Sequence, residues 1–528
     1  MKRYLTGILM TLVISMGVSA QSSTWETASE SVKNMTTGLN IGNTLDANGD
    51  WFTGTSPKDY ETCWGNPQIT RELIKAYKDG GFNALRLPVT WFQNMDENDH
   101  VREAWMDRVE EVVNYIIDED MYCILNVHHD TGAGDEAWLL ADLANIKTIQ
   151  TRFEKLWTQI ASRFEKYDDR LIFEGYNELL DAKKRWSSTD DDGYQAHNQL
   201  AQAFVSTVRK TGGNNAKRNL LVNTYSADPG QTSVNNFVIP TDETEGHLMI
   251  GAHVYKPDAF TSAKAGTNPE WTAAYQTDLE TYLKRLNKKF VAEGYPVIIG
   301  EWGTDEVPTE LERCKYAYFF IQKCKEYGLT PYYWFDIINR NTYEWKFTAL
   351  KEVLLGGEIG EIEMPDTPDV PTDGKVLFEG EHQLEYKDGG SMLFDANQFA
   401  DIDEGSVLVV EAEKMDEQLA GWWYHLIVYI NEPWTKIAEF TDTLPLVYTL
   451  TADDAQKIKD KGIQIQGHGV IVSKVMITTA GTNGIKTICN RENSSDAIYT
   501  LSGIKMLHSK ENLPKGIYII GNKKIVIR

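Results

Sequence analysis

Short apolar runs alternate with amphipathic segments over residues 37–340 of this chain. In residues 105–117, apolar side chains recur three and four positions apart, which is typical of a helix with one buried face. The runs between such segments contain many β-branched and aromatic residues, and eight of them are strand candidates: TGLNIGN, FNALRLPV, YCILNVHH, LIFEGYNE, NLLVNTYS, LMIGAHVY, PVIIGEW and TPYYWFD. Alternation of this kind indicates parallel strands joined by helical crossovers. Eight such units in roughly 300 residues predict an α/β fold, namely a (β/α)8 TIM barrel.

The pattern changes after the predicted barrel. Residues 358–374 are acidic and rich in proline without periodicity, so we interpret them as a linker. The runs SVLVVEAE, WWYHLIVYI, LVYTLTA and GVIVSKVMITTA follow, and they predict a small all-β sandwich domain over residues 375–480. Short strand-like runs then indicate a β-rich C-terminal tail over residues 481–528. The predicted barrel domain occupies residues 21–357.

The first twenty residues have the pattern of a secretory signal peptide. Two basic residues are followed by the apolar run of residues 5–18, and small residues come before the expected cleavage after Ala20. No cysteine follows the apolar run, so we expect no lipid anchor. The remaining chain has no apolar stretch of about 18 residues, so no transmembrane segment is expected. The sequence therefore predicts a secreted or cell-surface protein.

Composition narrows the range of partners. The formal net charge of −25 opposes binding to nucleic acid or to anionic membranes, and it favours a neutral or cationic partner. Fifteen Trp and 25 Tyr residues suit stacking on sugar rings, although aromatic rings also fill protein cores. The five cysteines show no CxxC spacing and the histidines no HxxxH spacing, so we expect neither a disulfide framework nor a metal site.

Polar side chains occur at the ends of most of the predicted barrel strands. In a (β/α)8 barrel, functional groups collect at the C-terminal strand ends. The residues at these ends are Arg86, His128, His129, Asn177, Glu178, His253, Tyr255, Glu301 and Trp334. Any one of them alone could form an ordinary ion pair, and one of the two adjacent histidines could have a purely structural role. As a set, they predict a site at the mouth of the barrel.

Glu178 and Glu301 follow different strands and are expected to face one cleft. Two facing carboxyl groups are what glycoside hydrolysis requires, with one acting as an acid and the other remaining ionised. We expect Arg86 and the Tyr255 hydroxyl to lower the pKa of Glu301, which suits a nucleophile. A retaining mechanism predicts carboxyl groups about 5 to 5.5 Å apart, whereas an inverting one needs roughly 6.5 to 9.5 Å.

Adjacent residues of a regular strand point to opposite sides. On that basis His128 and His129 are not expected to bind one metal ion together, whereas His253 and Tyr255, two positions apart, are expected to share a strand face.

Several stretches of the predicted barrel carry a family resemblance. They are LNIGNTLDA at 39–47, ETCWGNP at 61–67, GFNALRLPVTW at 81–91, LNVHHD at 125–130, LIFEGYNE at 171–178, VRKTGGNN at 208–215, HVYKPDAF at 253–260 and VIIGEWG at 297–303. Through them the chain from about Gly38 to Asp336 resembles glycoside hydrolase family 5, in particular its bacterial branch rich in endoglucanases and xyloglucanases. The resemblance implies a (β/α)8 barrel and a retaining mechanism that uses no cofactor.

The resemblance also implies the roles of individual residues. It makes Glu178 the acid/base and Glu301 the nucleophile. It further implies that the cleavage subsite is lined by Arg86, His128, Asn177, His253, Tyr255 and Trp334, with Asn43 and His129 close behind. The family's usual Asn-Glu-Pro reads Asn177-Glu178-Leu179 here, so we expect a local change of loop geometry without loss of side-chain chemistry.

The implied activity is hydrolysis of internal β-1,4-glucosyl bonds in cellulose, mixed-linkage β-glucan or xyloglucan. A xylanase or a mannanase of the same family is an alternative. A second alternative is a non-catalytic carbohydrate-binding surface protein, although the presence of both carboxylates argues against it.

Two features of the C-terminal region bear on binding and export. Trp422, Trp423, Tyr424 and Trp434 could form a platform for sugar stacking or belong to the sandwich core. Residues 481–528 resemble the C-terminal sorting domains of secreted Bacteroidetes proteins. That resemblance implies contact with a secretion machinery or cell-surface attachment, as in export from a Gram-negative bacterium.

Overall fold

The protein was analysed as a computed structural model, in which most of the chain is described. The described residues are 25–49, 51–187, 189–267, 269–357, 370–387, 389–415, 424–440 and 444–478, with four short strands within 498–527. The expected signal peptide, residues 358–369 of the expected linker, and Trp422 and Trp423 lie outside the described residues.

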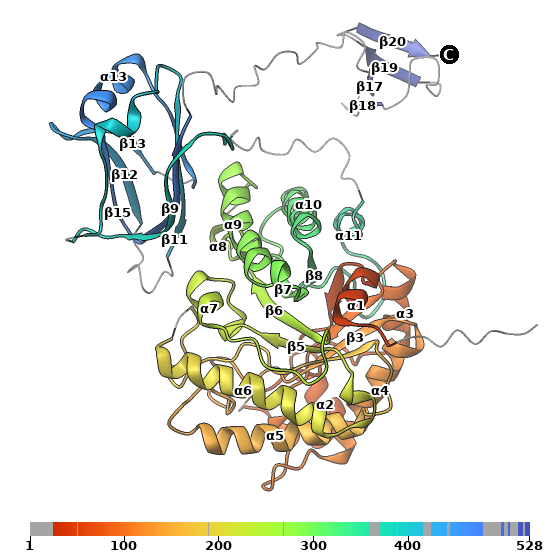
Figure 1. Ribbon diagram of the computed structural model, residues 1–528. Coiled ribbons are helices and arrows are strands. Elements are labelled where there is room, and N and C mark those ends of the chain that lie inside the picture. The colour runs from red at the N-terminus through yellow and green to blue at the C-terminus, as the bar shows by residue number, and fades with distance from the viewer. Residues whose placement is uncertain are drawn as a thin grey trace, which may run out of the picture.

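Eight parallel strands close into a barrel, and each of them overlaps one of the eight predicted runs. In chain order they are β1 (Gly38–Asn40), β2 (Ala84–Leu87), β3 (Tyr122–Asn126), β4 (Leu171–Glu174), β5 (Leu220–Asn223), β6 (Leu248–Val254), β7 (Val297–Trp302) and β8 (Leu329–Tyr333). Each strand pairs with the next, and β1 pairs with β8 to close the sheet. The (β/α)8 prediction is therefore confirmed (Figure 1).

Helices surround the barrel, as the amphipathic segments predict (Figure 1). The longer ones are α3 (Arg71–Asp79), α4 (Glu103–Asp118), α5 (Ile146–Arg163), α6 (Asp191–Lys210), α9 (Ala273–Lys289) and α10 (Glu310–Tyr327). The shorter ones are α1 (Ala28–Asn34), α2 (Pro57–Glu61), α7 (Gln231–Asn236), α8 (Asp258–Thr261) and α11 (Thr348–Leu354). In α4, Val109, Val112 and Ile116 are fully buried, so its apolar face packs on the barrel core.

Helix α1 closes the end of the barrel opposite the predicted site. Ala28 is fully buried in a small cluster with Ala84, Tyr122 and Leu221, which lie at or near the N-terminal ends of their strands. The amide of Ala28 also donates to the carbonyl of Gly246, just before β6. The C-terminal strand ends therefore form the open mouth.

Two antiparallel sheets follow the barrel in the chain and share a separate core. One has the order β10 (Met392–Phe394), β15 (Ile463–His468), β12 (His425–Ile430), β13 (Thr435–Glu439), and the other β14 (Leu446–Thr449), β11 (Val407–Lys414), β16 (Val470–Ile477), β9 (Lys375–Leu384). Helix α13 (Ala452–Lys461) packs on the same core. Leu408 and Val428, from different sheets, are both fully buried there, which confirms the predicted sandwich.

The C-terminal tail contains a small antiparallel sheet. Its strands are β17 (Ile498–Thr500), β18 (Lys505–Met506), β19 (Gly516–Ile520) and β20 (Lys523–Ile527). The tail is β-rich, as predicted.

The described cysteines Cys63, Cys123, Cys314 and Cys324 are free thiols. None of the helices in the described part of the chain has the length and apolar character needed to cross a membrane.

Candidate active site

Arg86 is the centre of a buried polar network at the mouth of the barrel. From β2, its guanidinium donates to both carboxylate oxygens of Glu174, at 2.7 and 2.8 Å, and to Oε1 of Glu301 at 2.8 Å. It also donates to Oδ1 of Asn40 at 3.0 Å and to Oδ1 of Asn177 at 2.7 Å. A fully buried guanidinium is stable only when its charge and its donors are paired. The guanidinium of Arg86, in β2, therefore connects β2 with β1, β4 and β7.

Glu174, Asn40 and Asn223 belong to this network but were missed from the sequence. Asn223 donates to Oε1 of Glu174 at 2.8 Å, and Asn40 donates to the carbonyl of Gly300 at 2.9 Å. Burial is the largest single influence on Glu174 and disfavours its charge, but Arg86, His253 and Asn223 together outweigh it and hold the pKa of this carboxyl below its ordinary value. The available signal was a polar residue as the last residue of an otherwise apolar strand, as in LIFE and LLVN.

Glu178 and Glu301 face each other across His253. Nδ1 of His253 lies 2.8 Å from Oε1 of Glu178 and 3.6 Å from Oε2 of Glu301. One oxygen of each carboxylate and one nitrogen of His253 all lie within 4.8 Å of one another. Tyr255 donates its hydroxyl hydrogen to Oε2 of Glu301 at 2.9 Å. The predicted contacts of Glu301 with Arg86 and Tyr255 are thus present.

A bulge in the barrel sheet brings His253 beside Glu301. The register of β6 against β7 shifts between Ala252 and His253, so that His253 pairs with Glu301. A bulge re-aims the side chains that follow it. Here it places an imidazole between the two carboxylates.

Burial dominates the ionisation of the carboxylate pair. It raises the pKa of Glu178 to about 7, against the opposing influence of His129 and Arg86. Burial also raises the pKa of Glu301, although His253 and Arg86 oppose the shift. The expectation that the pKa of Glu301 is lowered was therefore wrong in direction, because desolvation outweighs the nearby cation. Burial lowers the pKa of His253 to about 4, so its imidazole is neutral near neutral pH.

His128 and Trp334 form one wall of the site. Their rings are stacked with centroids 5.7 Å apart and planes 5° from parallel. Asn126 accepts from the amide of Val89 through Oδ1, so its side-chain nitrogen donates to Nδ1 of His128, which lies 3.1 Å away. A neutral His128 then carries its hydrogen on Nε2. Gly42 lies under the indole, since a Cβ there would be 2.7 Å from the Trp334 ring.

His128 and His129 do not point to opposite sides, contrary to the expectation from a regular strand. Strand β3 ends at Asn126, and the two imidazole centroids lie 4.5 Å apart in the loop that follows. Possible ligand atoms of Asp46, His128 and His129 all lie within 4.8 Å of one another. The Asp46 carboxylate already accepts from the amides of Asn43 and Thr44, at 3.0 and 2.8 Å, which explains its position without an ion.

Asn43 and His129 occupy different positions around this wall. Asn43 lies in the loop after β1 and is exposed. Its φ of 59° lies in the left-handed region, which asparagine tolerates better than most residues. His129 is half-buried, with Nε2 3.8 Å from Asp46 and its ring 5.5 Å from that of Trp64.

Exposed indole rings lie in loops that follow barrel strands. Trp51 and Trp64 follow β1 and are 66% and 40% exposed, and Trp186 follows β4 and is 46% exposed. In the sandwich, Trp434 is exposed whereas Tyr424 packs against the core, so these two do not form one continuous platform.

A closed parallel barrel with two carboxyl groups facing each other at its C-terminal mouth, beside exposed aromatic rings, defines the class of glycoside hydrolases. Comparison with known proteins supports the same class. The family model described as Cellulase (glycosyl hydrolase family 5) matches residues 45–339. Endoglucanase A of Clostridium longisporum is 33% identical, over 67% of this chain and 70% of its own length.

The chain is also similar to solved structures of glycoside hydrolase family 5 enzymes. A glycoside hydrolase family 5 enzyme from Prevotella bryantii B14 is 39% identical, with a TM-score of 0.60, and the match covers 63% of this chain and 98% of that one. A broad-specificity endoglucanase from Ruminococcus champanellensis with bound cellotriose is 38% identical, with a TM-score of 0.59, over 62% of this chain and 98% of that one. The chain belongs to glycosyl hydrolase family 5 and is a glycoside hydrolase of the cellulase type.

Proposed function

We propose that the protein is a retaining endo-β-1,4-glucanase with Glu178 as acid/base and Glu301 as nucleophile. The observation that carries this proposal is the closeness of the two carboxylates, which have an oxygen each within 4.8 Å of one another. An oxygen–oxygen separation of no more than 4.8 Å is compatible with the about 5 to 5.5 Å between the carboxyl groups of retaining enzymes, and it lies below the roughly 6.5 to 9.5 Å that an inverting enzyme needs for its water.

The reaction proceeds in two displacements. In the first, Glu301 attacks the anomeric carbon while Glu178 gives its proton to the departing glycosidic oxygen, so the carbon–oxygen bond of the chain breaks as the glycosyl–enzyme ester forms. In the second, Glu178 takes a proton from water, and the resulting attack at the anomeric carbon releases Glu301. The anomeric configuration is inverted twice and therefore retained.

The surroundings of the two carboxyl groups suit these different roles. A pKa of about 7 keeps Glu178 largely protonated in mildly acidic solution, as an acid must be. Glu301 is hydrogen-bonded by Arg86 and by Tyr255, donors that orient its carboxylate toward the sugar and stabilise its charge when the ester is cleaved.

The proposed substrates are cellulose, mixed-linkage β-glucan and xyloglucan. The exposed indoles of Trp51, Trp64 and Trp186 suit the apolar faces of successive glucose rings. The endoglucanase activity of the relatives and the cellotriose bound to one of them favour β-1,4-glucan over xylan or mannan. The branch of the family rich in endoglucanases and xyloglucanases is proposed on the same grounds.

A panel of purified polysaccharides tests the substrate. Reducing-sugar release is expected from carboxymethylcellulose, barley β-glucan and xyloglucan, and the first products seen by proton NMR should have the β configuration. Activity confined to xylan or mannan would overturn the glucan assignment. First products in the α configuration would overturn the retaining mechanism. Binding of these glucans without turnover would favour the non-catalytic alternative.

We further propose that residues 1–20 are a signal peptide and that residues 481–528 act in export or surface attachment. The basic start and apolar run support the first assignment, and the resemblance of the tail to sorting domains supports the second. In this division residues 21–357 form the catalytic domain, 358–374 the linker and 375–480 the sandwich. Mass spectrometry of the secreted protein tests it, because a chain that still begins at Met1 after export would contradict the signal peptide.

A further inference from the structure

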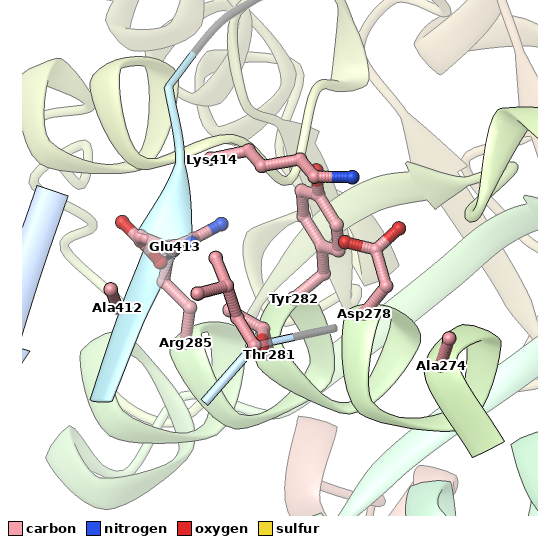
Figure 2. Close-up of a pocket in the computed structure, with 9 residues that line it drawn as sticks. Ala274, Asp278, Thr281, Tyr282, Arg285, Ala412, Glu413 and Lys414 are labelled. Atoms are coloured by element: carbon pink, nitrogen blue, oxygen red, sulfur yellow. Dashed lines mark ion pairs between the residues drawn. The ribbon is translucent and has the colours of Figure 1, made fainter. Parts of the chain in front are cut away.

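A cavity of about 720 Å³ lies where the sandwich meets the barrel. Its barrel side consists of Ser187 and of residues from the loops after β5 and β6 and from α9, and its sandwich side includes Lys414, Met415 and Tyr424. The size is within the range of roughly 300 to 1,000 Å³ that small-molecule sites span. Figure 2 shows an adjoining smaller pocket that shares several of these residues.

The sandwich is held against the barrel at this position by a buried cation. Arg285 of α9 forms an ion pair with Glu413 of β11, and it donates to the carbonyl of Pro229 in the loop after β5, at 2.9 Å. Both partners of the ion pair are largely buried. A buried pair of this kind fixes relative position even where its net contribution to stability is small.

The cavity lies on the catalytic face of the barrel. The loops after β4, β5 and β6 all contribute to it, and these loops leave the C-terminal strand ends. Lys256, which lines the cavity, directly follows Tyr255, the residue that donates to Glu301. Ser187 directly follows the exposed Trp186. The same loops thus border both the carboxylate pair and the cavity.

The charges around the cavity are balanced. Three acidic residues, Asp228, Asp258 and Asp278, line it together with three basic ones, Lys256, Arg285 and Lys414. A wall with no net charge does not select a polyanion or a polycation. It suits a neutral ligand with many hydrogen-bonding groups.

Asp278 and Lys414 line the cavity, and within the described part of the chain neither side chain has a hydrogen-bonding or ion-pair partner. Among the described residues, none makes a hydrogen bond or an ion pair with the Asp278 carboxylate, and the Lys414 ammonium contacts only the faces of Tyr424 and Phe440, with 5.6 Å to each centroid. In Figure 2 the two side chains are directed to the same side of Tyr282. A polar group in such surroundings is stable only when a ligand or water pairs with it. A sugar hydroxyl can donate to the carboxylate and accept from the ammonium.

We propose that this cavity binds a segment of the neutral polysaccharide, so that the sandwich extends the substrate cleft of the barrel. The inference rests on the proposed glucanase function. Asp278 of the barrel and Lys414 of the sandwich bind sugar hydroxyls, and Tyr275 and Tyr424 supply aromatic surface. The sandwich therefore acts as part of the substrate site and not as a spacer.

A pair of tryptophan substitutions on α9 tests the proposal in the full chain. Ala274 lines the cavity, whereas Ala273 does not and lies about 100° away around the helix. The measured quantity is kcat/KM for mixed-linkage β-glucan divided by kcat/KM for p-nitrophenyl cellobioside, a substrate with only two sugar rings. We expect Ala274→Trp to lower this ratio about tenfold, through loss of one or two hydrogen bonds, and Ala273→Trp to leave it at the wild-type value.

Equal ratios in both variants and the wild type would overturn the inference. If the wild type hydrolyses neither substrate, the proposed function fails instead, so the two failures are distinguishable.

A second pair of variants, at Asp278, tests the proposal independently if Ala274→Trp does not fold. In a Glu178→Gln background that blocks hydrolysis, calorimetry with cellohexaose should show about fivefold weaker binding for Asp278→Leu, which removes the hydrogen-bond acceptor. Asp278→Asn keeps an acceptor of the same shape and should bind nearer to the parent. Equal affinity of the parent and of Asp278→Leu would contradict a role for this carboxylate.

Discussion

Nδ1 of His253 lies 2.8 Å from a carboxylate oxygen of Glu178, the residue whose pKa burial raises to about 7. Because burial lowers the pKa of His253 to about 4, its imidazole is neutral between about pH 4 and pH 7 while Glu178 keeps its proton, so the pair carries no net charge in that range. This neutral pair is the form in which Glu178 can act as an acid.

The fall of kcat/KM on the alkaline side of its pH profile should reflect the ionisation of Glu178. A carboxyl with a pKa of about 7 is protonated below that pH, so kcat/KM should fall as the pH rises through about 7. On the acid side, the raised pKa of Glu301 means that its nucleophilic form is lost already above the ordinary value of 4.5 as the pH falls. Initial rates on p-nitrophenyl cellobioside across about pH 4 to 9, a range that includes both values, check both limbs.

A substrate that needs no acid provides the control for that profile. With 2,4-dinitrophenyl cellobioside the leaving group departs unprotonated, so the alkaline limb of kcat/KM should disappear while the acid limb stays. Persistence of the same alkaline limb would mean that a group other than Glu178 causes it.

Substitution of either carboxylate by its amide should separate the two roles. Glu301→Gln should lower kcat by at least about a thousandfold on every substrate, because no nucleophile remains. Glu178→Gln should do the same for polymeric glucan, but should keep much more activity on the dinitrophenyl substrate, and added azide should yield a β-glycosyl azide. The exposed Glu245→Gln is the matched control and should behave as wild type. Identical substrate dependence in the two active-site variants would contradict the assignment.

Removal of the buried guanidinium should damage both stability and activity. Arg86→Met leaves Glu174 and Glu301 in the barrel without their cation, and loss of one partner of a buried ion pair costs about 3 to 5 kcal/mol. Urea unfolding followed by tryptophan fluorescence measures this cost. Arg86→Lys restores a charge but not the planar fork, so it should recover part of the stability and little of the activity. A stability of Arg86→Met within about 1 kcal/mol of wild type would show that the network adapts.

One methyl group beneath Trp334 should disturb the sugar-stacking wall. A Cβ at Gly42 would lie 2.7 Å from the indole, so Gly42→Ala must displace the ring that stacks with His128. We expect kcat/KM on p-nitrophenyl cellobioside to fall about tenfold, since a lost aromatic contact is worth about 0.5 to 1.5 kcal/mol. Gly134→Ala is the control, because a Cβ there comes no closer than 3.6 Å to another residue. Equal rates for both variants would show that the indole position is unimportant.

Only some of the strands of the sandwich could be predicted from the sequence. Its runs in β11, β12, β14 and β16 were recognised because they are continuous and apolar. Strand β13 was missed because most of its residues are polar and none is fully buried, and such a run is not distinguishable from a loop by periodicity. Contact of the sandwich with α9 depends on Arg285 and Glu413, which are far apart in the chain and belong to no motif.

The sequence by itself determined the eight barrel strands and the two glutamates. Each strand is a buried run that local hydrophobicity identifies, and each glutamate follows such a run, so chain connectivity alone brings both to the same mouth. The tertiary structure decided that Arg86 also pairs with Glu174, that a bulge turns His253 between the carboxylates, and that the pKa of Glu301 is raised. These properties depend on desolvation and hydrogen bonds from all sides, between residues as many as 215 positions apart, and no local pattern encodes that sum.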